Sequence, residues 1–88
     1  MSEFYRFPAI KDLEEFDNSE QLEKIDSEVE ESRDAYFGAP NGVAFGIELM
    51  DVIHAAETAL RMNFTDEEVE NMHQLTISKN KKRGYYDD

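Results

Sequence analysis

The sequence predicts an all-α fold: an antiparallel helical bundle of three main helices, at about 19–37, 43–62 and 65–83, completed by oligomerisation. These three stretches carry apolar residues at helical spacing, and no stretch alternates as a strand does. The chain has 88 residues, which is enough for a single domain, 1–88, with a thin core. A second copy is therefore expected to help cover its apolar surface.

The first 17 residues leave two structures open. Apolar side chains recur there every three residues, which suits a short helix with Pro8 in its first turn. The same residues can instead form an extended arm that packs on the body of the protein. They are Phe4, Phe7, Ile10, Leu13 and Phe16. The polar residues 17–19 then offer side-chain oxygens that can begin a helix.

The next two helices follow from one apolar stripe and one apolar segment. Residues 19–37 place Leu22, Ile25, Val29 and Tyr36 on one face, and the glycines and proline of 38–42 form a turn. Residues 43–62 are apolar nearly all round, which is typical of a helix buried on more than one side. This helix is therefore the predicted subunit interface.

The third helix has clear signals at both ends. Thr65 and Glu68 form a capping box at its start. Four cations, Lys79, Lys81, Lys82 and Arg83, fill its last turn, where they suit the helix dipole. Gly84 is the expected residue just beyond the helix, and 84–88 form a tail.

Composition excludes several classes of function. Nine Lys and Arg against 21 Asp and Glu give a net charge of −12, which disfavours nucleic acid and anionic membranes as partners. Cysteine is absent, and two histidines alone cannot build a zinc site. No apolar run is long enough to span a membrane and no secretory leader is visible, so a cytoplasmic location is expected.

Two pairs of carboxylates are the part of the sequence that indicates a functional site. Glu28 and Glu31 are spaced i, i+3 on one helix, and Glu48 and Asp51 are spaced i, i+3 on the next. The first pair alone can be a solvated face, and the second can form salt bridges to a neighbouring helix. Carboxylates in an apolar helix are nevertheless costly unless paired or bound to metal. Oxygen ligands favour Mg²⁺, with Mn²⁺ as a possible substitute.

Together, Glu28-x-x-Glu31 and Glu48-x-x-Asp51 resemble the signature of MazG-like nucleotide pyrophosphohydrolases, the all-α NTP pyrophosphatase superfamily. Residues 24–31 look like the first family motif, 46–53 like the second, and the basic segment 79–84 is similar to the end of many members. The resemblance spans about residues 18–86. The chain departs from many members at Ser27, where they have a second Glu.

This resemblance implies a helical homodimer or dimer of dimers that binds Mg²⁺ through Glu28, Glu31, Glu48 and Asp51. It implies hydrolysis of a nucleoside triphosphate between the α and β phosphates, giving a monophosphate and pyrophosphate. Glu31 or Glu28 is the candidate catalytic base that orients water. Candidate substrate-binding residues are Lys24, Asn80, Lys82 and Arg83. The basic end can reach phosphates across a subunit boundary, or it can simply balance the helix dipole.

Three other functions stay open at this point. Phosphoribosyl-ATP pyrophosphohydrolases are relatives with similar acids. A helical adaptor or inhibitor could use an acidic face to bind a basic partner, although it would have no reason to bury Glu48 and Asp51. A family member that has lost catalysis could sense nucleotides.

Overall fold

The chain folds into three long α-helices and one short 3-10 helix. The structure, a computed structural model, describes residues 3–87. In chain order the elements are η1 (Leu13–Glu15), α1 (Asn18–Gly38), α2 (Val43–Asn63) and α3 (Asp66–Lys82). The prediction of an all-helical chain with three main helices is confirmed, and residues 3–87 contain no strand. Residues 1–2 of the predicted arm and residue 88 of the predicted tail lie outside the described residues.

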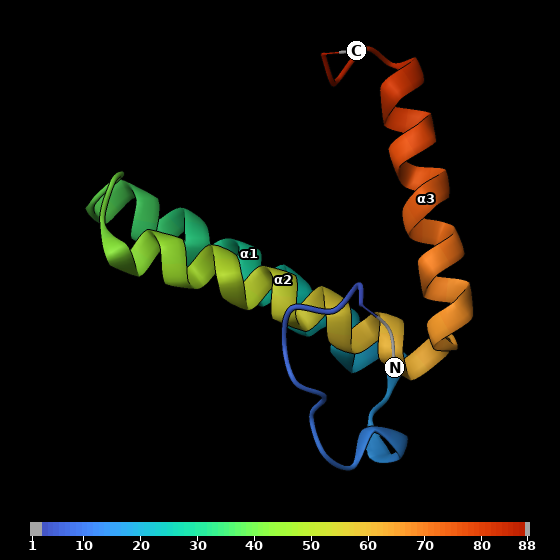
Figure 1. Ribbon diagram of the computed structural model, residues 1–88. Helices are drawn as coiled ribbons and strands as arrows, with labels where there is room; N and C mark the ends of the chain where they lie inside the picture. The colour runs from blue at the N-terminus through green and yellow to red at the C-terminus, as the bar shows by residue number, and fades with distance from the viewer. Residues whose placement is uncertain (1–2, 88) are drawn as a thin grey trace.

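Helices α1 and α2 form an antiparallel hairpin (Figure 1). Asp17 begins α1, because its side chain accepts a hydrogen bond from the backbone N–H of Glu20 at 3.4 Å. The turn predicted at 38–42 is present: the Ala39 N–H donates to Ala35 O, and the Gly42 N–H donates to Ala39 O at 2.9 Å. Such a short connection brings the inner faces of the two helices together along most of their length.

Helix α3 turns away from this hairpin. The two residues between α2 and α3, Phe64 and Thr65, are both extended, and this corner directs α3 outward (Figure 1). The predicted capping box is present, with the Glu68 N–H donating to Thr65 Oγ1 at 3.2 Å and the Thr65 N–H to Glu68 Oε1 at 2.9 Å. Gly84 has the left-handed φ of 78° expected just after a helix. Within one copy, antiparallel packing is thus confined to α1 and α2.

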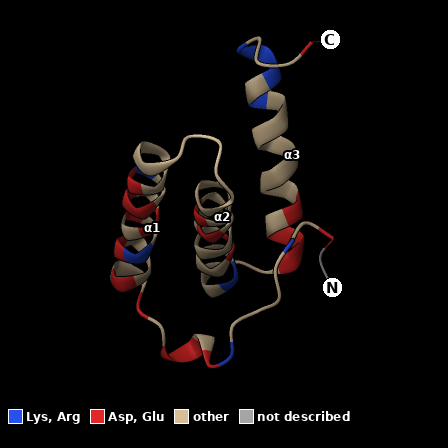
Figure 2. Ribbon diagram, turned by 90° about the vertical axis from the view of Figure 1, so that its left-hand side faces the viewer, with Lys and Arg blue, Asp and Glu red and all other residues tan. Residues whose placement is uncertain are grey.

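Acidic and basic residues lie on different parts of this fold (Figure 2). Acidic side chains cover α1 and the first turn of α3, whereas the basic residues of α3 are in its last turn, at the end that projects from the hairpin. The two charge groups are therefore well separated within one copy.

The interior of a single copy is small. Among residues 3–87, the buried hydrophobic residues are Ala55 and Val69, and the buried residues of α1 are all polar. Large apolar side chains stay exposed on every long helix, for example Leu22, Phe37, Val43, Ile47, Met50 and Leu75. No helix in the described part of the chain is long and apolar enough to cross a membrane.

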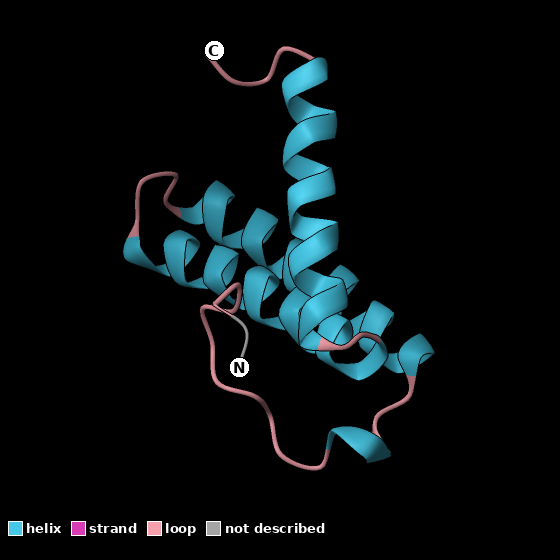
Figure 3. Cartoon of the chain, turned by 45° about the vertical axis from the view of Figure 1, so that its right-hand side comes forward, coloured by secondary structure: helices cyan, strands magenta, loops and turns pink. Residues whose placement is uncertain are grey.

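The N-terminal residues form an arm, which decides between the two structures that the sequence left open. The arm loops beside the hairpin before it enters α1, and its helical part is limited to η1 (Figure 3). Residues 4–7 are not helical, and the backbone N–H groups of Arg6 and Phe7 find their acceptor on α2, in the Glu57 carboxylate.

Candidate metal centre

An acidic cluster lies between α1 and α2. Glu28 of α1 and Glu48 and Asp51 of α2 each place one carboxylate oxygen within 4.8 Å of the others. Glu48 and Asp51 are one turn apart and share a face of α2, and Glu28 approaches that face from the opposite helix. The structure therefore brings together three of the four acids predicted as metal ligands.

Glu28 is the buried member of the cluster. Its side chain is 7% exposed, and its Oε1 forms an ion pair of 2.8 Å with Lys24 Nζ. Its Oε2 is buried and accepts no hydrogen bond from the described residues. The neighbouring carboxyl of Glu31 can donate one only when it is protonated. An unpartnered carboxylate oxygen inside a protein is costly unless a cation balances it. This oxygen is thus the feature of the cluster that indicates a bound cation.

Glu31, the fourth predicted acid, is exposed and lies outside the three-residue cluster, close enough to Glu28 and Glu48 to feel their charges. The negative charge of Glu28 raises the pKa of Glu31, a hydrogen bond to Glu28 favours the protonated form, and the charge of Glu48 adds to the increase. A raised carboxyl pKa brings a group closer to the range useful for accepting a proton near neutral pH. Glu31 therefore differs electrostatically from Glu28.

Lys24 supplies positive charge to the cluster. Its hydrogen bond to Glu28 lowers the pKa of that carboxyl and raises the pKa of the lysine. The charges of Glu31 and Asp51 also raise the pKa of Lys24. The cluster thus favours positive charge, which Lys24 supplies in this structure. Its own ligand atoms are all carboxylate oxygens, and such a donor set suits a hard divalent ion such as Mg²⁺ or Mn²⁺.

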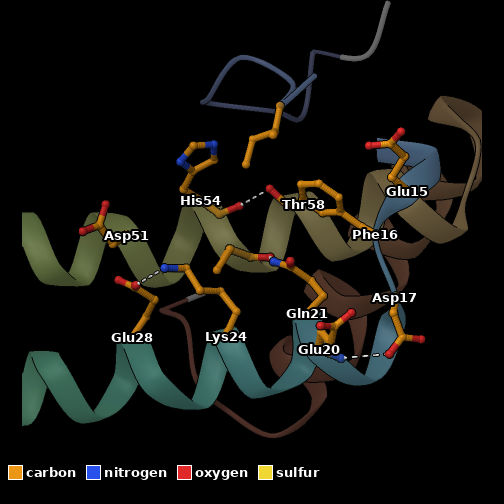
Figure 4. Close-up of a pocket in the computed structure, with 12 residues that line it drawn as sticks. Glu15, Phe16, Asp17, Glu20, Gln21, Lys24, Glu28, Asp51, His54 and Thr58 are labelled. Atoms are coloured by element: carbon orange, nitrogen blue, oxygen red, sulfur yellow. Dashed lines mark hydrogen bonds and ion pairs between the residues drawn. The ribbon is translucent and has the colours of Figure 1, made fainter. Parts of the chain in front are cut away.

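A cavity of about 580 Å³ opens beside the cluster (Figure 4). Glu28 and Asp51 lie at one end of it, and Glu15 and Phe16 of the N-terminal arm lie at the other. Ile10 of the arm also lines the cavity. Pockets of 300–1,000 Å³ are the usual size for small-molecule ligands. The cluster is thus accessible to a ligand larger than a metal ion.

The predicted substrate-binding residues are divided between two places. Lys24 lies in the cluster and lines the cavity. Asn80, Lys82 and Arg83 lie at the projecting end of α3, where the Asn80 carbonyl accepts from the backbone N–H of Arg83 at 3.1 Å. Within one copy these three residues do not meet the acidic cluster (Figure 2).

Sequence reasoning missed several residues around the cavity. Gln21 crosses from α1 to α2, with its Nε2 donating to the Ala55 carbonyl at 2.9 Å. Glu57 and Arg61 of α2 hold the arm that forms part of the cavity wall. One signal was available: Glu57 and Arg61 are charged residues one turn apart in the most apolar helix.

No protein-family model, curated protein or solved structure matches this chain.

Proposed function

We propose that this protein is a Mg²⁺-dependent nucleoside triphosphate pyrophosphohydrolase. The observation that carries the proposal is the buried carboxylate of Glu28, which has one unpartnered oxygen and meets Glu48 and Asp51 beside a cavity of about 580 Å³. A purely structural acid would have its oxygens satisfied by donors. Of the two acids that the sequence predicted to be buried, Glu48 is half-buried and Asp51 is exposed, so that expectation is not met. The acid that favours an enzyme over an adaptor is Glu28, which is buried.

In this proposal Glu28, Glu48 and Asp51 hold Mg²⁺, and Glu31 completes the set from the exposed side. A bound Mg²⁺ would neutralise phosphate charge and polarise the phosphorus that is attacked. Such an ion is needed because a chain of net charge −12 repels a triphosphate. Lys24 pairs with Glu28 before the metal arrives, and afterwards its ammonium group is available to a phosphate oxygen.

The proposed reaction is hydrolysis of the anhydride between the α and β phosphates. The oxygen of water forms a bond to the α phosphorus, pyrophosphate leaves with the bridging oxygen, and a carboxylate accepts the proton of water. Glu31 is the preferred acceptor because it lies on the exposed side of the cluster, where water can reach it, whereas Glu28 is buried and holds the metal in this proposal. The products are a nucleoside monophosphate and pyrophosphate, and the cytoplasm is the expected location.

A second copy of the chain is part of the proposal. The surface of 6866 Å² exceeds by about 1,500 Å² that expected for a compact monomer of this mass, and the radius of gyration is 14.9 Å against about 12 Å expected. This excess is comparable with one partner's share of an obligate dimer interface. In a homodimer or dimer of dimers, Asn80, Lys82 and Arg83 could reach the phosphates in the site of another copy.

Product analysis on a panel of nucleoside and deoxynucleoside triphosphates, with phosphoribosyl-ATP as one member, tests the function. We expect monophosphate and pyrophosphate in the presence of Mg²⁺ and neither product in EDTA. The double variant Glu48→Gln, Asp51→Asn should lose at least 100-fold in turnover, because two metal ligands are removed. The control variant Glu30→Gln removes one exposed charge of α1 outside the cluster and should keep the wild-type turnover. Release of single phosphate, or full activity in the double variant, would refute the proposal.

A further inference from the structure

The carboxylate of Glu57 in α2 accepts hydrogen bonds from the backbone of the N-terminal arm. It is 4% exposed, and both its oxygens face the arm rather than a basic side chain. The Arg6 N–H donates to Glu57 Oε2 at 3.0 Å, and the Phe7 N–H donates to Oε1 at 3.0 Å. Hydrogen bonds to an ionised carboxylate are stronger than neutral ones, so this contact is a specific point of attachment.

Arg61, one turn along α2, holds the same part of the arm. Its Nη2 donates to the Phe7 carbonyl at 2.9 Å, and its guanidinium lies 3.8 Å from the centroid of the Tyr5 ring. Burial raises the pKa of the Tyr5 hydroxyl, although the charge of Arg61 opposes this. The ring of Phe7 stacks on His54, with 4.8 Å between the ring centroids. Residues 5–7 are therefore fixed to α2 by backbone, cationic and aromatic contacts. Phe4 is attached to α3 instead: its N–H donates to Glu70 Oε1 at 3.1 Å, and its ring centroid lies 5.0 Å from that of His73.

The following residues, 8–16, are held differently. Their hydrogen bonds within the described chain are internal to the segment: the Glu15 N–H donates to Asp12 O and the Phe16 N–H to Leu13 O, both at 3.0 Å. Asp12 has a φ of 60°, in the left-handed region that residues other than glycine seldom adopt. Ile10 and Phe16 remain 38% and 37% exposed. This segment is thus secured at its two ends and has few polar contacts between them.

The same segment forms a wall of the cavity beside the acidic cluster. Ile10, Glu15 and Phe16 line it from the arm. Glu15 and Phe16 lie at the end away from Glu28 of α1 and Asp51 of α2 (Figure 4). His54 lines the cavity and also carries the stacked Phe7 ring, so it joins the attachment point to the cavity. Movement of residues 8–16 would change the width of the opening without breaking the α1–α2 hairpin.

We propose that residues 4–16 form a strap, latched to Glu57, that opens and closes the cavity over the acidic cluster. Opening requires release of the backbone of Arg6 and Phe7 from Glu57, together with separation of Phe7 from His54. The contacts that keep the strap closed join the arm to α2 and, through Phe4, to Glu70 and His73 of α3. None of these contacts bridges α1 and α2, so the helical hairpin stays intact in the open form. This proposal concerns access to the cavity and does not depend on which ligand the cavity binds.

Thiol labelling of the 88-residue chain tests the strap, because this sequence has no cysteine. Ala55→Cys places one thiol in the cavity wall at a position that is 6% exposed. Ser32→Cys places one at the α1–α2 interface, 5% exposed and outside the cavity lining. The probe is N-ethylmaleimide, which is uncharged. The labelling rate at residue 55 reports opening of the cavity, and the rate at residue 32 reports opening of the hairpin.

Each thiol is combined with two latch variants. Glu57→Gln weakens the backbone attachment. Phe7→Ala removes the ring stacked on His54 and leaves the charge of the protein unchanged. It therefore controls for a direct effect of the Glu57 charge on the reactivity of the thiol. We expect both variants to label at least tenfold faster at residue 55, with less than a twofold change at residue 32. Glu30→Gln should leave both rates unchanged.

Two results would overturn the proposal. Unchanged labelling at residue 55 in both latch variants would mean that the latch does not control access to the cavity. Equal acceleration at residues 55 and 32 would mean that Glu57 and Phe7 stabilise the whole hairpin and that the arm has no separate movement.

Discussion

Glu48→Gln should stabilise the metal-free protein and weaken its response to Mg²⁺. In the metal-free state Glu48 lies beside two other carboxylates, Glu28 and Asp51, with oxygens within 4.8 Å of one another. Glutamine keeps the shape of the side chain and removes the repulsion. With Mg²⁺ present, the same change removes a ligand. A residue that serves only the fold would not give these two opposite effects.

The magnitude follows from this separation. Two unit charges 4.8 Å apart repel each other by about 0.9 kcal/mol at the dielectric constant of water and about 3.5 kcal/mol at an effective value of 20. Glu48 is half-buried, so we expect a gain of about 1 kcal/mol, or about 4–8 °C in Tm for a domain of this size. At a Mg²⁺ concentration about 100 times Kd, a tenfold loss of affinity removes about 1.4 kcal/mol of the stabilisation by the metal.

The assay is thermal unfolding followed by circular dichroism, in EDTA and across a Mg²⁺ titration, at fixed protein concentration and ionic strength. Glu30→Gln is the matched control, because it removes the same charge from an exposed position of α1 outside the cluster. A lower Tm for Glu48→Gln in EDTA, or an undiminished Mg²⁺ response, would refute the account of the cluster.

Three further predictions concern other parts of the account. Lys24→Met should cost about 1–3 kcal/mol in EDTA, because it leaves the carboxylate of Glu28, whose side chain is 7% exposed, without its ion-pair partner. It should also increase the Mg²⁺-induced rise in Tm by removing a competing cation; an unchanged or smaller rise would contradict this. In EDTA, the raised pKa of Glu31 means that the folded state binds its proton more tightly than the unfolded state, so this group lowers wild-type stability as pH rises above the ordinary glutamate pKa of about 4.3. The Tm of Glu31→Gln minus that of wild type should therefore be near zero well below that pH and larger at neutral pH, and a flat difference would count against the raised pKa. Thr65→Ala should lower Tm by about 4–8 °C, because loss of the capping box with Glu68 costs about 1 kcal/mol, and an unchanged Tm would show that α3 does not need its cap.

The helix limits could be predicted because they depend on local signals. Asp17 and Thr65 cap α1 and α3 through their own side chains, and the glycines and proline of 38–42 break the chain between α1 and α2. The meeting of Glu28 with Glu48 and Asp51 could be predicted for a related reason: a short turn between two helices requires an antiparallel hairpin, and spacing then places the acids on facing sides.

Two features could not be predicted, because contacts distant in the sequence decide them. The apolar spacing of residues 4–16 suits a helix as well as an arm, and the choice falls to Glu57, whose carboxylate captures the backbone of residues 6 and 7 from about 50 positions away. The direction of α3 is set by the extended corner at Phe64 and Thr65. Periodicity identifies the apolar face of α3 but does not identify the surface that covers it.

The central claim is that the acids between α1 and α2 bind a divalent cation, and a Mn²⁺ titration tests it most directly. Electron paramagnetic resonance reports free Mn²⁺, so the bound fraction can be measured for the wild type, for Glu48→Gln with Asp51→Asn, and for the exposed control Glu30→Gln. We expect the wild type and the control to bind Mn²⁺ in a way that Mg²⁺ displaces, and the double variant to bind at least tenfold more weakly. Equal binding by all three proteins would place any bound ion elsewhere on the acidic surface and contradict the claim.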